Sequence, residues 1–293
     1  MERIEHPAPP WRASSPEVVY TSSPHSSVHL AAWREMVQEL WSSRELTWRL
    51  FLRDFSARYR QSVFGYLWAV LPALLTAGTF LWLTQSRVLT VSATTLPYPV
   101  FVLLGLTVWQ LFAGGVTGAT QSLTNAGTLI AKINFPRETL VLAAFGQALF
   151  EFLLRLLLVA IAFALCRVAP SGTILFLPLA MLPLCLFTLG LGFLLALANG
   201  VMRDVGQMLM VALTFWMFLT PVVYPAPVSG SRALLNVVNP ISPFVIAAQD
   251  LAGRGHLTQP GNYAIACVIS LLLFLLGWRV FHVTEPRIAE RAG

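Results

Sequence analysis

The sequence predicts an all-α integral membrane protein with six transmembrane helices and cytoplasmic N and C termini. Of its 293 residues, 56% are hydrophobic and only 11% are charged, whereas soluble domains carry about 25% charged residues. Six apolar stretches are each long enough for a helix to cross a bilayer, which takes about 20 residues. The Lys and Arg residues also gather on one side of these stretches. These three observations exclude an ordinary water-soluble enzyme.

The six expected spans cover residues 63–85, 98–121, 139–166, 173–198, 205–224 and 263–281. Fourteen of the nineteen Lys and Arg residues, including Arg279 near the end of the last span, fall on the side of the two termini. Because loops rich in Lys and Arg stay in the cytoplasm, both termini are predicted to be cytoplasmic. The same distribution argues against nucleic-acid binding, since these residues line an anionic membrane face.

The segment before the first span divides in two. Residues 1–28 are rich in Pro, Ser and His, a composition typical of a disordered cytoplasmic tail. Residues 29–62 repeat Leu and Trp at helical spacing opposite arginines, which predicts an amphipathic region at the membrane interface or against a partner protein. Within it, the pattern Ser42-x-x-Glu45 predicts a capping box that begins a second helix. At the other end, residues 282–293 are expected to form a cytoplasmic tail.

Several kinds of chemistry are excluded or disfavoured by residue type. Lys132 is the only lysine, and it does not lie in the G-x-x-x-x-G-K-[ST] pattern that a P-loop requires, so the chain has no ATP-binding loop of that type. The three cysteines lie within or at the ends of apolar runs and show no metal-ligand spacing. The five histidines lie in tails or loops, without a catalytic or metal-binding pattern. We therefore expect no catalytic site, no metal site and no cofactor in this chain.

One pair of opposite charges lies within an expected span. Glu151 and Arg155 are four residues apart in the stretch 139–166, so they share a helix face and can pair with each other. Charged residues within a membrane are often functional. The pair is either a self-neutralised contact that holds helices together or part of a water-filled pathway or conformational switch, and the sequence leaves both open.

The cytoplasmic loop 122–138 has an unusual composition. It is too polar to span the membrane and too apolar for a freely solvated loop, and a proline follows its last apolar residues. This composition predicts a short helix parallel to the membrane. Its apolar side chains, including Leu129, Ile130 and Phe135, would be available to a groove on a partner protein.

The non-cytoplasmic loop 225–262 combines five prolines with two short apolar stretches. Short re-entrant helices that dip into the outer leaflet would account for both features, provided that neighbouring protein satisfies their backbone groups. Aromatic side chains are frequent in the first and fifth spans. Such residues commonly face lipid, but they could also line a passage along which sugar rings slide.

Five blocks in order make the sequence resemble the membrane subunit of ABC transporters that export polysaccharides such as O-antigen, capsule or teichoic acid. Together the blocks extend from about residue 45 to 250. They are Arg53-Asp54 with Arg58 to Ser62, Gly65 and Trp68; Tyr98-Pro99 with Gly105 and Trp109; the loop 122–138; Ala198-Asn199 with Arg203 to Gly206; and Thr220 to Pro225 followed by Asn239-Pro240.

The resemblance implies a permease homodimer in the bacterial inner membrane, bound to two copies of a separate ATPase that carries ATP and Mg²⁺. Residues 126–137 would form the coupling segment seated in the ATPase, and the first and fifth spans would line the passage for a lipid-linked glycan. The same architecture also serves exporters of drugs, haem or small lipids, which remains the alternative. The implied coupling residues are Asn125, Leu129, Ile130, Lys132, Phe135, Pro136, Arg137, Arg203 and Asp204. The implied pathway residues are Tyr66, Trp68, Phe215, Trp216, Phe218 and Tyr224.

Overall fold

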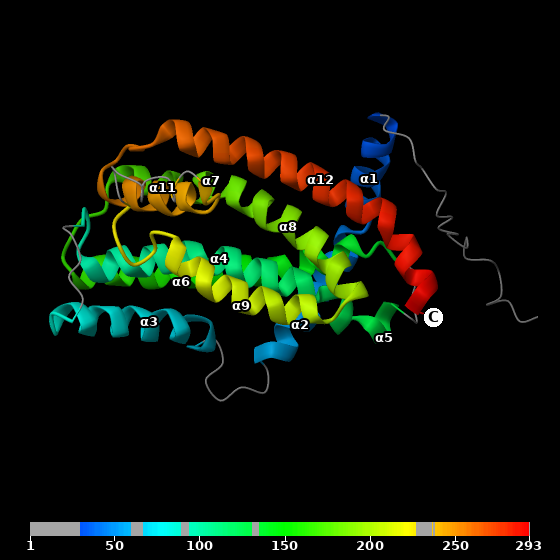
Figure 1. Ribbon diagram of the computed structural model, residues 1–293, viewed down its shortest axis with the longest axis horizontal. Helices are drawn as coiled ribbons and strands as arrows, with labels where there is room; N and C mark the ends of the chain where they lie inside the picture. The colour runs from blue at the N-terminus through cyan, green and yellow to red at the C-terminus, as the bar shows by residue number, and fades with distance from the viewer. Residues whose placement is uncertain are drawn as a thin grey trace, which may run out of the picture.

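A computed structural model describes residues 30–59, 67–88, 94–130, 135–226, 236 and 238–292. All regular structure in these residues is helical, and the helices form one elongated bundle (Figure 1). The predicted disordered tail, residues 1–28, lies outside the described residues. The elements are α1 (Leu30–Ser42), α2 (Arg44–Tyr59), α3 (Leu67–Gln85), α4 (Tyr98–Asn125), α5 (Gly127–Ile130), α6 (Glu138–Leu165), η2 (Gly172–Phe176), α7 (Leu177–Ala180), α8 (Leu182–Val201), α9 (Asp204–Leu219), α11 (Ser242–Gly253) and α12 (Pro260–Ala292).

Four stretches of the described chain are long and apolar enough to cross a membrane: Tyr98–Asn125, Glu138–Leu165, Gly172–Val201 and Pro260–Glu285. They coincide with the second, third, fourth and sixth expected spans. The first and fifth are represented by shorter apolar helices, Val70–Gln85 and Asp204–Leu219. The helix α9 has 16 residues, which at 1.5 Å per residue measure about 24 Å, less than the roughly 30 Å of bilayer hydrocarbon.

Two helices end at other residues than the expected spans do. The fifth span was expected to reach residue 224, but α9 ends at Leu219 and a turn follows at Thr220. Pro221 has no backbone N–H and cannot continue the helical hydrogen bonds. At the C terminus, the expected tail from residue 282 continues α12 as far as Ala292.

The helix α4 forms the centre of the bundle. Most of its residues are buried, from Val100 near its start to Leu123 near its end. It packs against α6 and α8 over most of its length and against α3, α9 and α11 over shorter stretches. The two ends of the bundle are distinct in Figure 1. We call them the α5 end, where the last turns of α12 also lie, and the α11 end.

Small residues let the helices approach closely. A Cβ on Gly115 of α4 would lie 2.6 Å from the Thr188 side chain of α8, and one on Gly190 of α8 would lie 2.6 Å from the backbone oxygen of Leu273 in α12. Close approach at small residues is the usual way in which helices associate in membranes, because burial of apolar surface gives little advantage over lipid. These contacts make α4, α8 and α12 a tightly packed unit.

The amphipathic region 29–62 contains two helices, α1 and α2, as its pattern of apolar residues suggests. The expected capping box is wrong in its hydrogen bonding. The Ser42 hydroxyl donates to the backbone oxygen of Glu39 at 2.8 Å, and so closes α1 instead of capping α2. Trp33 of α1 contacts Trp278 of α12, with ring centroids 6.0 Å apart. Trp41 and Trp48 remain exposed.

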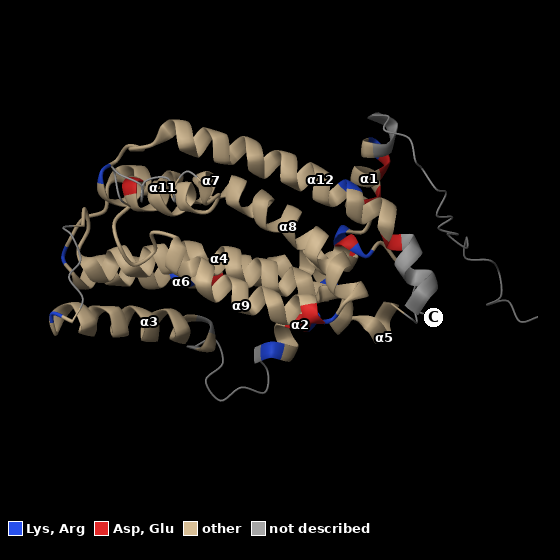
Figure 2. Cartoon of the chain, in the orientation of Figure 1, with Lys and Arg blue, Asp and Glu red and all other residues tan. Residues whose placement is uncertain are grey.

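Charged side chains are distributed unevenly along the bundle (Figure 2). They are concentrated on α1, α2, the start of α6 and the end of α12, while the middle portions of α4, α8 and α9 carry none. This asymmetry agrees with the excess of Lys and Arg that the sequence places on the side of the termini.

Candidate functional site

The predicted coupling segment, residues 126–137, lies at the α5 end of the bundle. It begins where α4 ends, and α5 forms a single turn in which the backbone N–H groups of Leu129 and Ile130 donate to the Ala126 oxygen at 2.9 and 3.0 Å. Asn125 is exposed, and Leu129 and Ile130 are half-buried against the core. Lys132 falls in 131–134, outside the described residues.

The segment returns to the bundle at Phe135. This side chain was expected to face a partner's groove, but it is only 8% exposed and belongs to the core of its own chain. That part of the prediction is wrong, because an apolar composition alone does not distinguish a residue that anchors the segment from one that presents a surface. Pro136 and Arg137 follow, and the Thr139 hydroxyl donates to the Pro136 oxygen at 2.7 Å within the first turn of α6.

Asn199, near the end of α8, links the segment Arg203–Asp204 to the end of α4. Its Oδ1 accepts the backbone N–H of Gly206 at 2.9 Å, and its Nδ2 donates to the backbone oxygen of Thr120 at 3.1 Å. Arg203 and Asp204 are exposed at the start of α9. The sequence marked Asn199 only as part of a motif, although a buried amide between two helix ends is the group that brings them together.

The predicted pathway aromatics divide into two groups. Trp68 on α3 and Phe215 and Phe218 on α9 are more than half exposed. Trp216 and Tyr224 are partly buried; the Tyr224 hydroxyl donates to the Phe218 oxygen at 3.0 Å. Tyr66 lies outside the described residues.

Trp216 turns toward the core, not toward an open surface. Its indole N–H donates to Asn239 Oδ1 at 3.0 Å, and its ring contacts Phe112 with a centroid separation of 5.3 Å. Since a buried indole N–H requires a partner, this position is fixed by Asn239, which precedes α11. Of the predicted pathway residues on α9, Phe215 and Phe218 therefore retain the exposure that a passage requires.

Glu151 and Arg155 pair as predicted, but they have a third partner. Glu151 Oε2 accepts from Arg155 Nη2 at 2.7 Å, and its Oε1 accepts from Arg58 Nη1, also at 2.7 Å. Arg58 belongs to α2 and is 56% exposed, whereas Arg155 is buried. We call these three residues the charged trio. The Glu151 carboxylate is thus shared between an arginine of its own helix and an arginine of α2.

An aromatic contact brings α2 to this position. Phe51 and Phe55 lie along one face of α2, and Phe55 meets Phe150 of α6 edge to face at 4.8 Å. Gly146 leaves room for this approach, because a Cβ there would lie 3.2 Å from the Phe51 ring. The spacing of Phe51, Phe55 and Arg58 on one helix was the sequence signal that could have suggested a contact between α2 and a charged span.

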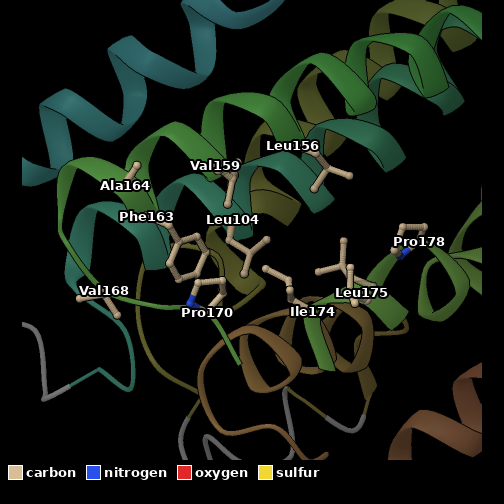
Figure 3. A pocket seen from close by; sticks show the side chains of 12 residues that line it. Leu104, Leu156, Val159, Phe163, Ala164, Val168, Pro170, Ile174, Leu175 and Pro178 are labelled. Atoms are coloured by element: carbon tan, nitrogen blue, oxygen red, sulfur yellow. The ribbon is translucent and has the colours of Figure 1, made fainter. Parts of the chain in front are cut away.

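A separate apolar pocket of about 500 Å³ lies between α4, α6 and the η2–α7 segment (Figure 3). Leu104, Val159, Phe163 and Ile174 point into it, and every residue that lines it is apolar. Such a lining suits hydrocarbon and offers no hydrogen bonds to a glycan. Within the described part of the chain, no group of three or more His, Cys, Asp or Glu residues could hold a metal ion.

Comparison with known proteins identifies the family. Residues 45–251 match the model of the ABC-2 type transporter family. The chain belongs to the ABC-2 type transporter family. The matched residues include the coupling segment, Asn199 and the charged trio, and they end before α12.

Curated relatives of this ABC-2 protein share one name. It is 27% identical over 259 residues to the O-antigen export system permease protein RfbA of Myxococcus xanthus, covering 87% of this chain and 98% of the relative. It is 25% identical over 244 residues to a protein of the same name from Klebsiella pneumoniae, covering 81% and 91%. The chain is a multi-pass permease of the bacterial inner membrane.

Proposed function

We propose that this chain is the membrane subunit of an ATP-driven exporter that moves a lipid-linked polysaccharide of the O-antigen type across the inner membrane. The observation that carries the proposal is its similarity to an O-antigen export permease over 98% of that protein's length. The similarity therefore includes the membrane helices and the coupling segment together. Neither relative favours the alternative of a drug, haem or small-lipid exporter.

The proposed permease has six membrane helices and cytoplasmic termini, with the α5 end facing the cytoplasm. The excess of Lys and Arg on that side supports this orientation. The helices α3 and α9 complete the six. At the opposite end, α11 is almost completely buried. The backbone of a short helix that does not cross the bilayer is tolerated in a membrane only when protein surrounds it. The burial of α11 therefore supports its assignment as a re-entrant helix.

Two copies of the chain would work with two copies of a separate ATPase, which holds ATP and Mg²⁺. In each copy, Asn125, Leu129, Ile130 and Lys132 would face the ATPase, together with Arg203 and Asp204. Phe135 has a different role from the others. Because it is buried in the permease core, it would anchor the segment, so that a push from the ATPase moves α6 instead of bending the loop.

The passage for the glycan would run beside the exposed aromatic faces of α3 and α9. Trp68, Phe215 and Phe218 supply flat apolar rings on that surface. The charged trio would lie where α2 meets α6, beside the route by which the lipid-linked substrate enters. Arg58 and Arg155 both pair with the Glu151 carboxylate there.

The proposal is tested in a strain whose own O-antigen permease gene is deleted and which carries this chain together with a P-loop ATPase of an O-antigen exporter. We expect surface O-antigen to return, and Pro136→Gly or Phe135→Ala to reduce it while ATP hydrolysis continues. Val268→Ala, at an exposed position of α12 away from the coupling segment and the passage, is the control and should export normally. Restored ATP hydrolysis without any surface glycan would exclude the proposed substrate.

A further inference from the structure

The last turns of α12 hold the point at which the coupling segment enters α6. The backbone N–H of Arg137 donates to Glu285 Oε1 at 3.1 Å, and the Arg137 Nε lies 3.6 Å from the same oxygen. The next residue, Glu138, is 4% exposed, and its Oε1 lies 2.8 Å from Nδ1 of His282. Two adjacent residues of the chain are thus bound by two residues of one distant helix.

The geometry of α12 makes these two contacts act together. His282 and Glu285 are three residues apart, so their side chains lie on the same face of the helix. The Glu285 carboxylate sits at the N terminus of α6, where the first backbone N–H groups lack helical partners and attract negative charge. Arg137, at the N-cap position, makes no side-chain capping bond of its own. Glu285 therefore caps α6 from another helix.

Movement of this end of α12 must be shared with the helices on which it is packed. Phe281 is fully buried, and its ring centroid lies 5.1 Å from that of Phe193 in α8. Further along, Gly277 faces Gly190 of α8 in direct backbone contact. Packed interfaces of this kind move as units, because interiors resist deformation.

We propose that His282 and Glu285 are positioning residues for transport, which clamp the coupling segment to α12 so that movement of the ATPase carries α12 and α8 along with α6. The inference rests on the proposed function, since it requires an ATPase seated on the coupling segment. It also gives a role to a helix that lies beyond the residues matched by the family.

The first test measures glycan exported per ATP hydrolysed in the complete permease–ATPase complex. Glu285→Ala removes the acceptor of the Arg137 N–H, and we expect the ratio to fall by about fivefold or more. Glu285→Gln keeps an oxygen within reach and should restore most of the export. Val283→Ala, at an exposed position of the same turn, is the control. Parent-like coupling in Glu285→Ala, or equal loss in Glu285→Ala and Glu285→Gln, would overturn the proposal.

The second test does not depend on export. Spin labels at Thr128→Cys and Val283→Cys, in a background in which Cys166, Cys185 and Cys267 are replaced by alanine, report the distance between the coupling segment and α12. We expect one narrow distribution that is the same with and without ATP in the parent complex and broader in Glu285→Ala. A distance that changes with ATP in the parent would exclude the clamp. A constant distance in a complex that exports no glycan would instead refute the proposed function and leave the clamp intact.

Discussion

The two ends of the bundle are held together by different kinds of polar contact. Toward the α5 end some contacts between distant segments are ionic, as in Arg58 with Glu151 and Arg137 with Glu285, and they accompany the neutral bond from Asn199 to the Thr120 oxygen. At the α11 end they are neutral, as in the bond from Trp216 to Asn239. Further examples at the α11 end are the bonds from Asn239 to Thr220, from Gln249 to the Pro221 oxygen and from Tyr98 to the Val223 oxygen.

The difference between ionic and neutral contacts predicts which end of the bundle moves during transport. The contact of Arg58 with Glu151 has a partner that is more than half exposed, so it can open without leaving both groups unsolvated. Asn239 is buried, and opening its contacts would leave polar atoms without partners, at the full desolvation cost. We infer that the α11 end is the fixed frame of the permease and that the α5 end moves when the ATPase acts, with the coupling segment still bound to α12.

The largest loss of stability is expected when Asn239 is replaced by alanine. This change leaves the N–H groups of Trp216 and Ile241 without their acceptor, and we expect a loss of about 3 kcal/mol in the free energy of unfolding. Unfolding of the purified protein in detergent measures it. Trp216→Phe removes the donor of the same hydrogen bond. The double variant should therefore lose less free energy of unfolding than the two single variants added together.

Asn262→Ala is the matched control for this change, because Asn262 is partly exposed and its side-chain amide donates to the nearby Gln259. A loss below about 0.5 kcal/mol is expected for such a site. If Asn239→Ala were no worse than Asn262→Ala, the neutral network would not hold the α11 end, and the comparison between the two ends would fail.

An intermediate loss of stability is expected when Gly105 is replaced by alanine. A Cβ at this position would lie 2.5 Å from the backbone oxygen of Val222, which belongs to the turn after α9. Gly105→Ala must displace that turn, and we expect a loss of about 2 kcal/mol. Gly114, nine residues along the same helix, has open space at its Cβ position, and Gly114→Ala should stabilise the protein by about 0.5 kcal/mol. Equal effects of the two substitutions would argue against a closely packed α11 end.

The smallest effect is expected for Arg58→Ala. Arg58 is more than half exposed, and Glu151 keeps Arg155 as a partner, so we expect a loss of about 0.5 kcal/mol. The difference from the parent protein should shrink further when the salt concentration rises from about 0.05 M to 0.5 M, because salt screens exposed charges. A large loss that does not depend on salt would mean that the contact between α2 and α6 is as rigid as the α11 end.

Sequence reasoning located helices better than it located contacts. It placed the apolar core of α4, α6, α8 and α12 and the helical region before the first span. It missed the partnership of Arg58 with Glu151, 93 residues apart, and that of Glu285 with Arg137, 148 residues apart. It also misjudged Phe135 and Trp216, which face the core. Apolar periodicity marks a face as apolar, but lipid and protein core are both apolar, so it does not tell them apart.

The sequence by itself determined that this is a helical membrane protein of the ABC-2 type, with an excess of positive charge on one side and no P-loop. These properties depend on composition, on the length of apolar stretches and on the order of short motifs. Only the tertiary structure decided that α2 packs on α6, where Arg58 completes the charged trio. It also decided that α12 caps the N terminus of α6, directly after the coupling segment. A polar side chain needs a partner wherever it is buried, and which residue provides it depends on how distant helices are placed beside one another.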